Sequence, residues 1–301
     1  MKRFALVILF PLFASIAFSQ DDLMKILEED SQEGVIYTLA TFKSTRVMNG
    51  HSTQSMPPGQ LDFRVSHRFG TLNSGAYNFF GLDESNIHLS LEYGILKWLM
   101  AGIGRGSLEK TYDAFTKFSI LKQSTGLKNM PVSFSAVTSA ALKTIKFPEE
   151  RDTNYFTSRM AYTVQILVAR KFSQAFSFQL APTYIHRNFI SGNPDARNLY
   201  ALGAGARLKL SKRVSLNGEY YYLTERGNYQ FQQTYNPLSI GFDIETGGHV
   251  FQLIFTNSRG MIEKSFIGET TGSWQDGDIH FGFNISRVFK LKRAGETGSD
   301  R

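Results

Sequence analysis

Hydrophobic and polar residues alternate along most of this chain. The alternation is clearest in GDIHFGFNISRVFKL, residues 277–291, where Ile279, Phe281, Phe283 and Ile285 share one parity and most residues between them are small or polar. Because successive side chains of a β-strand point to opposite sides, such a strand has one apolar face and one polar face. A soluble sandwich and a membrane barrel both provide these two environments, so the rest of the sequence is needed to distinguish the two folds.

Segments of this kind recur about twelve times, each near the roughly ten-residue length of a tilted strand that crosses a bilayer. Examples are QLDFRVSHRF, NIHLSLEY, SRMAYTVQILVARKF, VSLNGEYYYL and HVFQLIFT. Tight links occur at residues 95–97, 173–174, 211–213 and 247–248, and longer polar links at about 70–85, 144–156, 188–197, 224–236 and 257–277. Short turns at one end and long loops at the other are typical of an outer-membrane barrel.

The number of strands depends on where the chain enters and leaves the barrel. If both termini are periplasmic, the number must be even, and strands counted from Leu61 meet this condition. We therefore predict an all-β fold, a transmembrane antiparallel up-and-down β-barrel of about twelve strands over residues 59–291, with short periplasmic turns and longer extracellular loops. An alternative adds Thr41–Val47 as a partial strand at the seam, where the first and last strands meet. This addition would make the number of strands odd.

The first nineteen residues have the pattern of an export signal. Lys2 and Arg3 precede an apolar run over residues 4–13, and small residues follow at Ala17 and Ser19. This predicts a signal peptide over residues 1–19 and localisation in the bacterial outer membrane, with membrane lipid and the barrel-assembly machinery as partners. Residues 20–58 then form a periplasmic N-terminal arm or plug, and residues 292–301 a polar C-terminal tail.

Charge and cysteine content exclude several classes of protein. The chain has 33 Lys and Arg residues against 26 Asp and Glu residues, and the two signs are interspersed. This is unlike the basic patch of a nucleic-acid-binding protein, so we expect no nucleic-acid partner. The sequence contains no cysteine, which excludes disulfides and thiolate metal sites.

Several strings resemble a known family. LDFRVSHRFG, SRMAYTVQILVARKFS, SIGFDIETGGHVFQLIFTNSRGM and GDIHFGFNISRVF are similar to an uncharacterised family of outer-membrane β-barrel proteins of Gram-negative bacteria, defined as a domain of unknown function. The resemblance covers about residues 40–291. It implies the fold and the location, and it supplies no catalytic residues.

The inward parity of the predicted strands collects polar and charged side chains, as expected for a barrel lumen. The lumen-lining candidates are Asp62, Arg64, Arg68, His88, Glu92, Asp113, Lys117, Arg159, Arg207, Lys209, Glu219, Asp243, Glu245 and His280. They either pair with one another and fill the bore or form a selectivity lining for a polar solute. Arg46, Asn49 and His51 of the N-terminal arm are the candidates for a plug that meets lumen acids.

Motifs for catalysis, metals and cofactors are not found. The six histidines are scattered without zinc spacing, and GIGRG (102–106) and GAGAR (203–207) lie inside alternating strands rather than before a helix. The arrangement most similar to a lipase site is His186 with Asn188 at an outer strand end, but no serine can be assigned as the nucleophile. We therefore predict no enzyme, no catalytic residue, no metal and no cofactor.

Three functions remain at this point. The favoured one is passive or gated passage of a small polar solute. The alternative is a closed barrel that acts as a receptor, an assembly factor or a structural partner. An outer-membrane lipid hydrolase is the least favoured of the three. A channel needs a continuous wet lumen, whereas a closed barrel needs matched inward charges and a filled bore.

Overall fold

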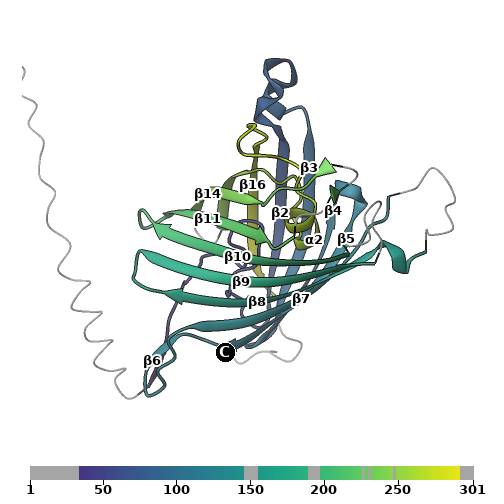
Figure 1. The fold of residues 1–301 in the computed structure, drawn as a ribbon. Helices are drawn as coiled ribbons and strands as arrows, with labels where there is room; N and C mark the ends of the chain where they lie inside the picture. The colour runs from purple at the N-terminus through teal and green to yellow at the C-terminus, as the bar shows by residue number, and fades with distance from the viewer. Residues whose placement is uncertain are drawn as a thin grey trace, which may run out of the picture.

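Twelve antiparallel strands form a closed barrel in the computed structural model, which describes residues 34–145, 155–188, 197–225, 228–229, 232–246 and 249–291. The prediction of a twelve-stranded all-β barrel is confirmed (Figure 1). The barrel strands are β2 (Gln60–Thr71), β3 (Ser85–Leu96), β4 (Leu99–Gly106), β5 (Tyr112–Leu121), β7 (Ser133–Leu142), β8 (Met160–Lys171), β9 (Phe176–Arg187), β10 (Asn198–Lys209), β11 (Val214–Leu223), β14 (Leu238–Thr246), β15 (His249–Thr256) and β16 (His280–Lys290).

The last strand closes the barrel against the first. In the β16–β2 pair, Ile285 lies opposite Val65 and Phe289 lies opposite Leu61. Closure leaves no strand edge exposed to hydrocarbon, where an unpaired backbone group costs several kcal/mol. Residues 41–47 form no strand at this seam, so the alternative with a partial seam strand does not apply.

The two ends of the barrel differ in their connections. Leu291 donates its amide to the carbonyl of Gly59 (3.0 Å), so the barrel begins and ends at the same end, here named the turn end. Its links are short except that over residues 122–132, where β6 (Ser124–Gly126) pairs with β1 (Val35–Tyr37). The tight pair predicted at residues 247–248 lies outside the described residues.

The opposite end, named the loop end, carries longer connections with short elements of their own. Figure 1 shows β2 and β3 rising to a projecting connection at this end. These elements are η1 (Leu72–Ser74), η2 (Ala76–Gly81), η3 (Leu108–Lys110), η4 (Thr157–Arg159), β12 (Asn228–Tyr229), β13 (Gln232–Gln233) and the helix α2 (Glu263–Gly268). No helix in the described part of the chain is both long and apolar enough to cross a membrane.

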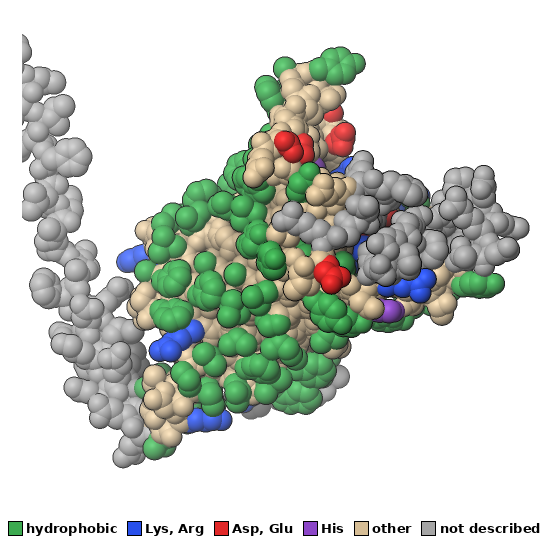
Figure 2. Space-filling model, in the orientation of Figure 1, with side chains coloured by type: hydrophobic (Ala, Val, Ile, Leu, Met, Phe, Trp, Pro, Cys, Tyr) green, Lys and Arg blue, Asp and Glu red, His purple; other side chains and the backbone are tan. Residues whose placement is uncertain are grey.

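Side chains alternate between the outer surface and the lumen as the sequence pattern predicts. On β3, Leu89 and Leu91 are 45% and 41% exposed on the outside, whereas His88 and Glu92 are buried on the inside. Figure 2 shows hydrophobic side chains spread over the outer wall in view. The outside of the barrel is therefore the apolar face, and the inside is the face that needs polar partners.

Two segments fill the lumen. The first, named the inner segment, is residues 41–56, which are mostly buried and contact side chains from β2, β3, β5, β9, β11, β14, β15 and β16. The second, named the loop insert, is residues 257–279 between β15 and β16, which contain the buried helix α2. The signal peptide, the acidic start of the N-terminal arm and the C-terminal tail fall outside the described residues.

Candidate functional site

The inner segment is a hairpin whose tip lies deep in the lumen. Val47 donates its amide to the carbonyl of Gly50 (2.8 Å), and Ser52 donates to the carbonyl of Thr45 (2.9 Å). A Cβ on Gly50 would lie 2.2 Å from the Tyr221 hydroxyl oxygen, so only glycine allows this approach of the tip to β11. After the tip the chain returns to the turn end, where Gly59 donates to the carbonyl of Gly94.

Glu219 on β11 binds the main chain of the tip. Its carboxylate accepts the amides of Met48 (3.3 Å), Asn49 (2.7 Å) and Gly50 (3.0 Å). Three N–H donors that converge on one carboxylate compensate the cost of burying its charge. The carboxylate and the tip therefore hold each other in place.

Lys117 on β5 contacts the two legs of the hairpin. Its ammonium donates to the carbonyls of Thr45 (3.0 Å), Ser52 (3.0 Å) and Gln54 (2.8 Å). An ammonium group has three donors and no acceptor, so these three bonds use its full capacity. Burial of Lys117 therefore depends on the inner segment being in place.

Arg46 connects the inner segment to the wall and to the loop insert. Its guanidinium donates to the Glu263 carboxylate of α2 (2.7 Å), and its Nε lies 3.6 Å from the Glu92 carboxylate of β3. Burial disfavours the charge, but Glu263 and Glu92 outweigh that effect and raise the pKa of Arg46. A cation from one end of the chain thus bridges two carboxylates from distant segments.

The surroundings of Glu92 continue this polar network. Thr45 donates its hydroxyl to Glu92 (2.5 Å), and Arg64 donates to the Thr45 hydroxyl (2.7 Å) and to Asp62 (3.0 Å). These side chains are all buried. The charges on β2 and β3 are therefore matched to each other and to the inner segment.

His51 lies inside the lumen and is fully buried. Its ring packs edge-on against Phe115 at a centroid distance of 4.5 Å, and its Nε2 lies 3.4 Å from a carboxylate oxygen of Glu263. Burial and the positive charges of Arg46 and Lys117 lower the pKa of His51 well below 6.5. The imidazole is therefore neutral at physiological pH.

The loop insert is held by both apolar and polar contacts. Phe266 of α2 is fully buried against Tyr221, with a ring-centroid distance of 5.2 Å, and belongs to the cluster that contains Ile185 and Leu199. At its polar side, Lys264 donates to carboxylates of Glu109 and Glu269, each at about 3 Å. Burial opposes the charge of Lys264, but Glu269 and Glu109 raise its pKa overall.

Six of the lumen-lining candidates surround the inner segment. These are Asp62, Arg64, Arg68, Glu92, Lys117 and Glu219. Arg68 donates to the side-chain oxygen of Asn49 (2.7 Å), whose amide nitrogen donates to Ser239 (3.1 Å). The three plug candidates, Arg46, Asn49 and His51, therefore lie together in the hairpin; Arg46 and Asn49 contact these residues, whereas His51 contacts Phe115 and Glu263.

Six further candidates pair elsewhere along the wall. His88 lies 2.7 Å from Asp113, and the side chain of His280 lies 2.8 Å from the carbonyl of Phe69. Near the turn end, Gln252 donates to Asp243 (2.8 Å), and Glu245 lies 3.9 Å from Arg207 and 2.9 Å from Lys43.

Two candidates do not line the wall as predicted. Arg159 lies in the short helix η4 before β8 begins, and Lys209 is exposed at the end of β10. In both places the alternation of the sequence continues past the part of the strand that encloses the lumen. The alternation therefore predicts one inward-facing position too many at each of these strand ends.

The glycine-rich strings are parts of strands, as the sequence indicated. GIGRG lies in β4 and GAGAR in β10. A Cβ on Gly102 would lie 2.3 Å from the Phe115 ring, and one on Gly203 would lie 2.4 Å from the Tyr221 ring. These glycines make room for large lumenal rings on the neighbouring strands.

The surroundings of His186 differ from the pair named in the sequence analysis. Its Nδ1 lies 2.7 Å from Asn198, whereas Asn188 donates to the carbonyl of Thr157 (2.7 Å). Within the described residues, no cluster of three or more His, Asp or Glu side chains could hold a metal ion.

Part of the lumen wall is apolar, which the parity of the strands did not predict. Ile185, Leu199, Tyr221 and Leu223 face inward and bury the loop insert. A signal for them exists in the strings NLYALGAG and GEYYYL, where both parities are apolar or aromatic. A strand that is apolar on both faces indicates that something apolar covers its inner face.

The comparisons with known proteins fit this geometry. A family model described as "Membrane bound beta barrel domain (DUF5777)" matches residues 42–289, which is most of the chain. The protein belongs to this family. No curated protein matches the sequence.

Solved porins and channels have a similar fold to this member of the membrane-bound barrel family. An outer membrane channel from Pseudomonas putida F1 is 13% identical with a TM-score of 0.48, and the match covers 79% of this chain and 98% of that one. The NanC porin is 8% identical with a TM-score of 0.45, covering 77% and 99%. The KdgM porin is 8% identical with a TM-score of 0.42, with the same coverage.

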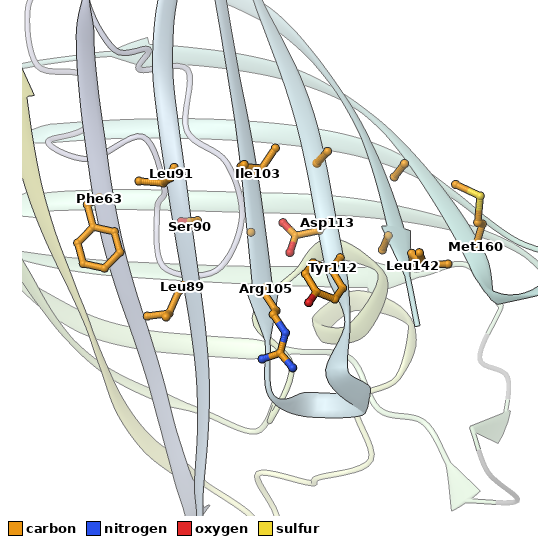
Figure 3. A pocket seen from close by; sticks show the side chains of 14 residues that line it. Phe63, Leu89, Ser90, Leu91, Ile103, Arg105, Tyr112, Asp113, Leu142 and Met160 are labelled. Atoms are coloured by element: carbon orange, nitrogen blue, oxygen red, sulfur yellow. The ribbon is translucent and has the colours of Figure 1, made fainter. Parts of the chain in front are cut away.

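In a membrane-bound barrel the outer wall faces lipid, and this wall has a shallow apolar groove of about 600 Å³. Figure 3 shows Phe63 and Leu91 on one side of it, Leu142 and Met160 on the other, and Arg105 between them beside Tyr112. The groove exists because small residues, Ala114 opposite Ala140, form its floor. It lies on the outside of the wall and is separate from the lumen site.

Proposed function

We propose that this protein is a gated channel of the bacterial outer membrane for a small polar solute, and that the inner segment is its plug. In this proposal the turn end faces the periplasm and the loop end faces outside. The plug lies in the lumen in the closed state, and the channel conducts when the plug withdraws towards the turn end.

The observation that carries the proposal is that wall side chains hold the inner segment largely through hydrogen bonds to its main chain, although the segment also buries Phe42, Val47, Met48 and Met56. Glu219 and Lys117 bind main-chain amides and carbonyls, which water can replace when the segment leaves. The net free energy of such an exchange is only about 0.5–1.5 kcal/mol for each hydrogen bond. Release also exposes the buried apolar side chains of the segment, each at about 1.5–3 kcal/mol, so the docked state is the more stable one and openings are rare events.

The loop insert differs from the inner segment in how it is attached to the wall. It connects β15 to β16 and is therefore anchored to a wall strand at both ends, whereas the inner segment continues into a wall strand only at β2. Phe266 and Ile267 of the loop insert are also fully buried, and exposing each of them costs about 1.5–3 kcal/mol. We therefore assign gating to the inner segment and a permanent narrowing of the pore to the loop insert.

A closed barrel that acts as a receptor or a structural partner is the second candidate. The matched inward charges favour it, because Arg46, Arg64 and Lys117 all have partners in the filled lumen. In such a barrel the inner segment is a permanent core. The two candidates therefore differ in whether the inner segment ever leaves.

Single-channel conductance of a variant that lacks residues 20–55 tests the proposal. The refolded mature chain and the variant are compared in planar bilayers, after heat-shifted gel mobility shows that each is a folded barrel. We expect discrete steps of clearly higher conductance in the variant. A matched control removes part of the exposed connection over residues 72–82, where Tyr77 is 96% exposed, and should conduct like the intact chain. Equal conductance of all three would rule out the plug.

We further propose that the barrel is not an enzyme, which leaves the lipid hydrolase as the least favoured candidate. His186 and Asn198 make an exposed contact near the loop end. A histidine and an amide lack the nucleophile that acyl transfer needs. Release of fatty acid from phospholipid vesicles by detergent-activated protein would contradict this proposal.

A further inference from the structure

The lumen wall recognises the main chain of the inner segment. Gln179 accepts the amide of Thr53 (3.0 Å) and donates to the carbonyl of His51 (2.8 Å). Gln252 donates to the carbonyl of Val47 (3.0 Å), and Asn284 donates to that of Met48 (2.9 Å). Together with Glu219 and Lys117, five wall side chains among the described residues contact groups that every peptide possesses.

These wall groups are arranged for a polypeptide. Glu219 on β11 accepts hydrogen bonds from amides, and Lys117 on β5 donates to carbonyls. Around the closed sheet, β5 lies five strands from β11 in one direction and seven in the other. The two strands thus lie on opposite sides of the lumen. A chain threaded between them presents N–H groups to one wall and C=O groups to the other, which a backbone does through its alternating donors and acceptors.

We propose that the solute of this channel is a peptide, and that it binds through its main chain to Glu219, Lys117, Gln179, Gln252 and Asn284 in place of the plug. This inference rests on the proposed function, because the lumen is free for a solute only when the inner segment withdraws. It names the class of solute and predicts broad tolerance of the peptide's sequence.

The side-chain contacts of the plug account for its advantage over an external peptide. Arg46 binds Glu263, and Thr45 binds Glu92, which an arbitrary peptide does not reproduce. The plug is also covalently attached, which gives it an effective concentration of about millimolar. In the closed state the inner segment therefore binds the wall in preference to an external peptide, and peptides enter after its release.

Peptide binding to the variant without residues 20–55 tests the inference directly. Three fluorescent peptides spanning residues 41–56 are compared by anisotropy. One is native, one carries N-methyl groups on the amides of residues 48, 49 and 50, and one carries Asn49→Ala, His51→Ala and Thr53→Ala. N-methylation removes the donors to Glu219 while it keeps every side chain.

We expect the N-methylated peptide to bind at least about tenfold more weakly than the native one, since it loses three bonds to a carboxylate. The alanine peptide should lose less than the N-methylated one, and unlabelled maltotetraose should not displace the native peptide. Equal binding of the native and N-methylated peptides would overturn the inference. Displacement by the oligosaccharide, or a larger loss for the alanine peptide, would overturn it too.

The two proposals fail in different ways. A variant without residues 20–55 that binds peptide but does not conduct contradicts the channel and keeps the peptide site. A variant that conducts but binds no peptide contradicts the peptide site alone. If that deletion prevents folding, Arg46→Ala in the full chain replaces it, and block of its conductance by the native peptide but not by the N-methylated one is then expected. Equal block by both peptides, or by neither, overturns the inference.

Discussion

Arg46 is the residue on which docking of the inner segment depends most. It bridges Glu263 of the loop insert and Glu92 of the wall, and all three side chains are buried. Removal of one partner of a buried ion pair leaves an uncompensated charge.

Arg46→Ala should weaken docking of the inner segment by about 3–5 kcal/mol, the usual cost of breaking a buried pair. The readout is an increase in the open probability of single channels. Lys43→Ala is the matched control, because Lys43 and Glu245 keep 29% and 26% of their side chains exposed and such pairs contribute about 0–1 kcal/mol. An effect of Lys43→Ala as large as that of Arg46→Ala would contradict the assignment.

His51 should make docking sensitive to pH. Burial, Arg46, Lys117 and Arg64 lower its pKa in the docked state well below 6.5, although Glu263 lies 3.4 Å away. The docked state therefore binds the proton less tightly than the released state, so docking is fully stable above pH of about 6.5 and weakens as the pH falls below it.

We expect conductance of the intact protein to rise between pH 7.5 and pH 5, and His51→Gln to reduce this rise. Current recorded at both pH values from the same bilayer provides the measurement. An unchanged pH dependence in His51→Gln would contradict the assignment of the effect to His51.

At the scale of elements, the strands were predictable and the elements inside the barrel were not. Period-two alternation defined twelve strands and their inward faces, because one parity must face lipid. The helix α2 has only six residues in a long connection, so no periodicity marks it. The link over residues 122–132 is longer than the other turns because its strand β6 pairs with β1.

The candidate site was predictable in its residues and not in its contacts. Parity identified Glu219 and Lys117, and the charged N-terminal arm suggested Arg46, Asn49 and His51. The alternation identifies the side chains that face the lumen, but it does not identify their contact partners. Those contacts depend on how the hairpin of the inner segment folds inside the barrel. Glu263 was missed for that reason, since it lies in a loop that enters the lumen.

The hairpin amides report whether the inner segment moves as a unit. In Glu219→Gln, an NH₂ group that cannot accept a hydrogen bond replaces one of the two oxygens that share the three amide donors, and the negative charge is lost. We expect hydrogen exchange at residues 48–50 to accelerate by about tenfold or more. The amides of the paired wall strands β7 and β8, which Glu219 does not contact, are the internal control and should not change. Unchanged exchange at residues 48–50 would show that Glu219 does not hold the tip.

At the scale of the whole molecule, the barrel combines a rigid wall with two different fillings. Closure of β16 on β2 fixes the wall, attachment to β15 and β16 fixes the loop insert, and main-chain hydrogen bonds together with a few apolar side chains hold the inner segment. Of the two fillings, only the inner segment is joined to the wall strands at one end alone. The central claim is therefore that the inner segment leaves and returns in an otherwise unchanged barrel.

A reversible lock tests this claim most directly. The natural chain has no cysteine, so a pair introduced by Asn49→Cys and Ser239→Cys, whose side chains are in hydrogen-bond contact at 3.1 Å, can form only one disulfide. Conductance of single channels is recorded after oxidation and again after reduction in the same bilayer. We expect the oxidised barrel to be silent and discrete openings to appear after reduction. Identical records in the two states, with the crosslink verified by mass, would contradict it.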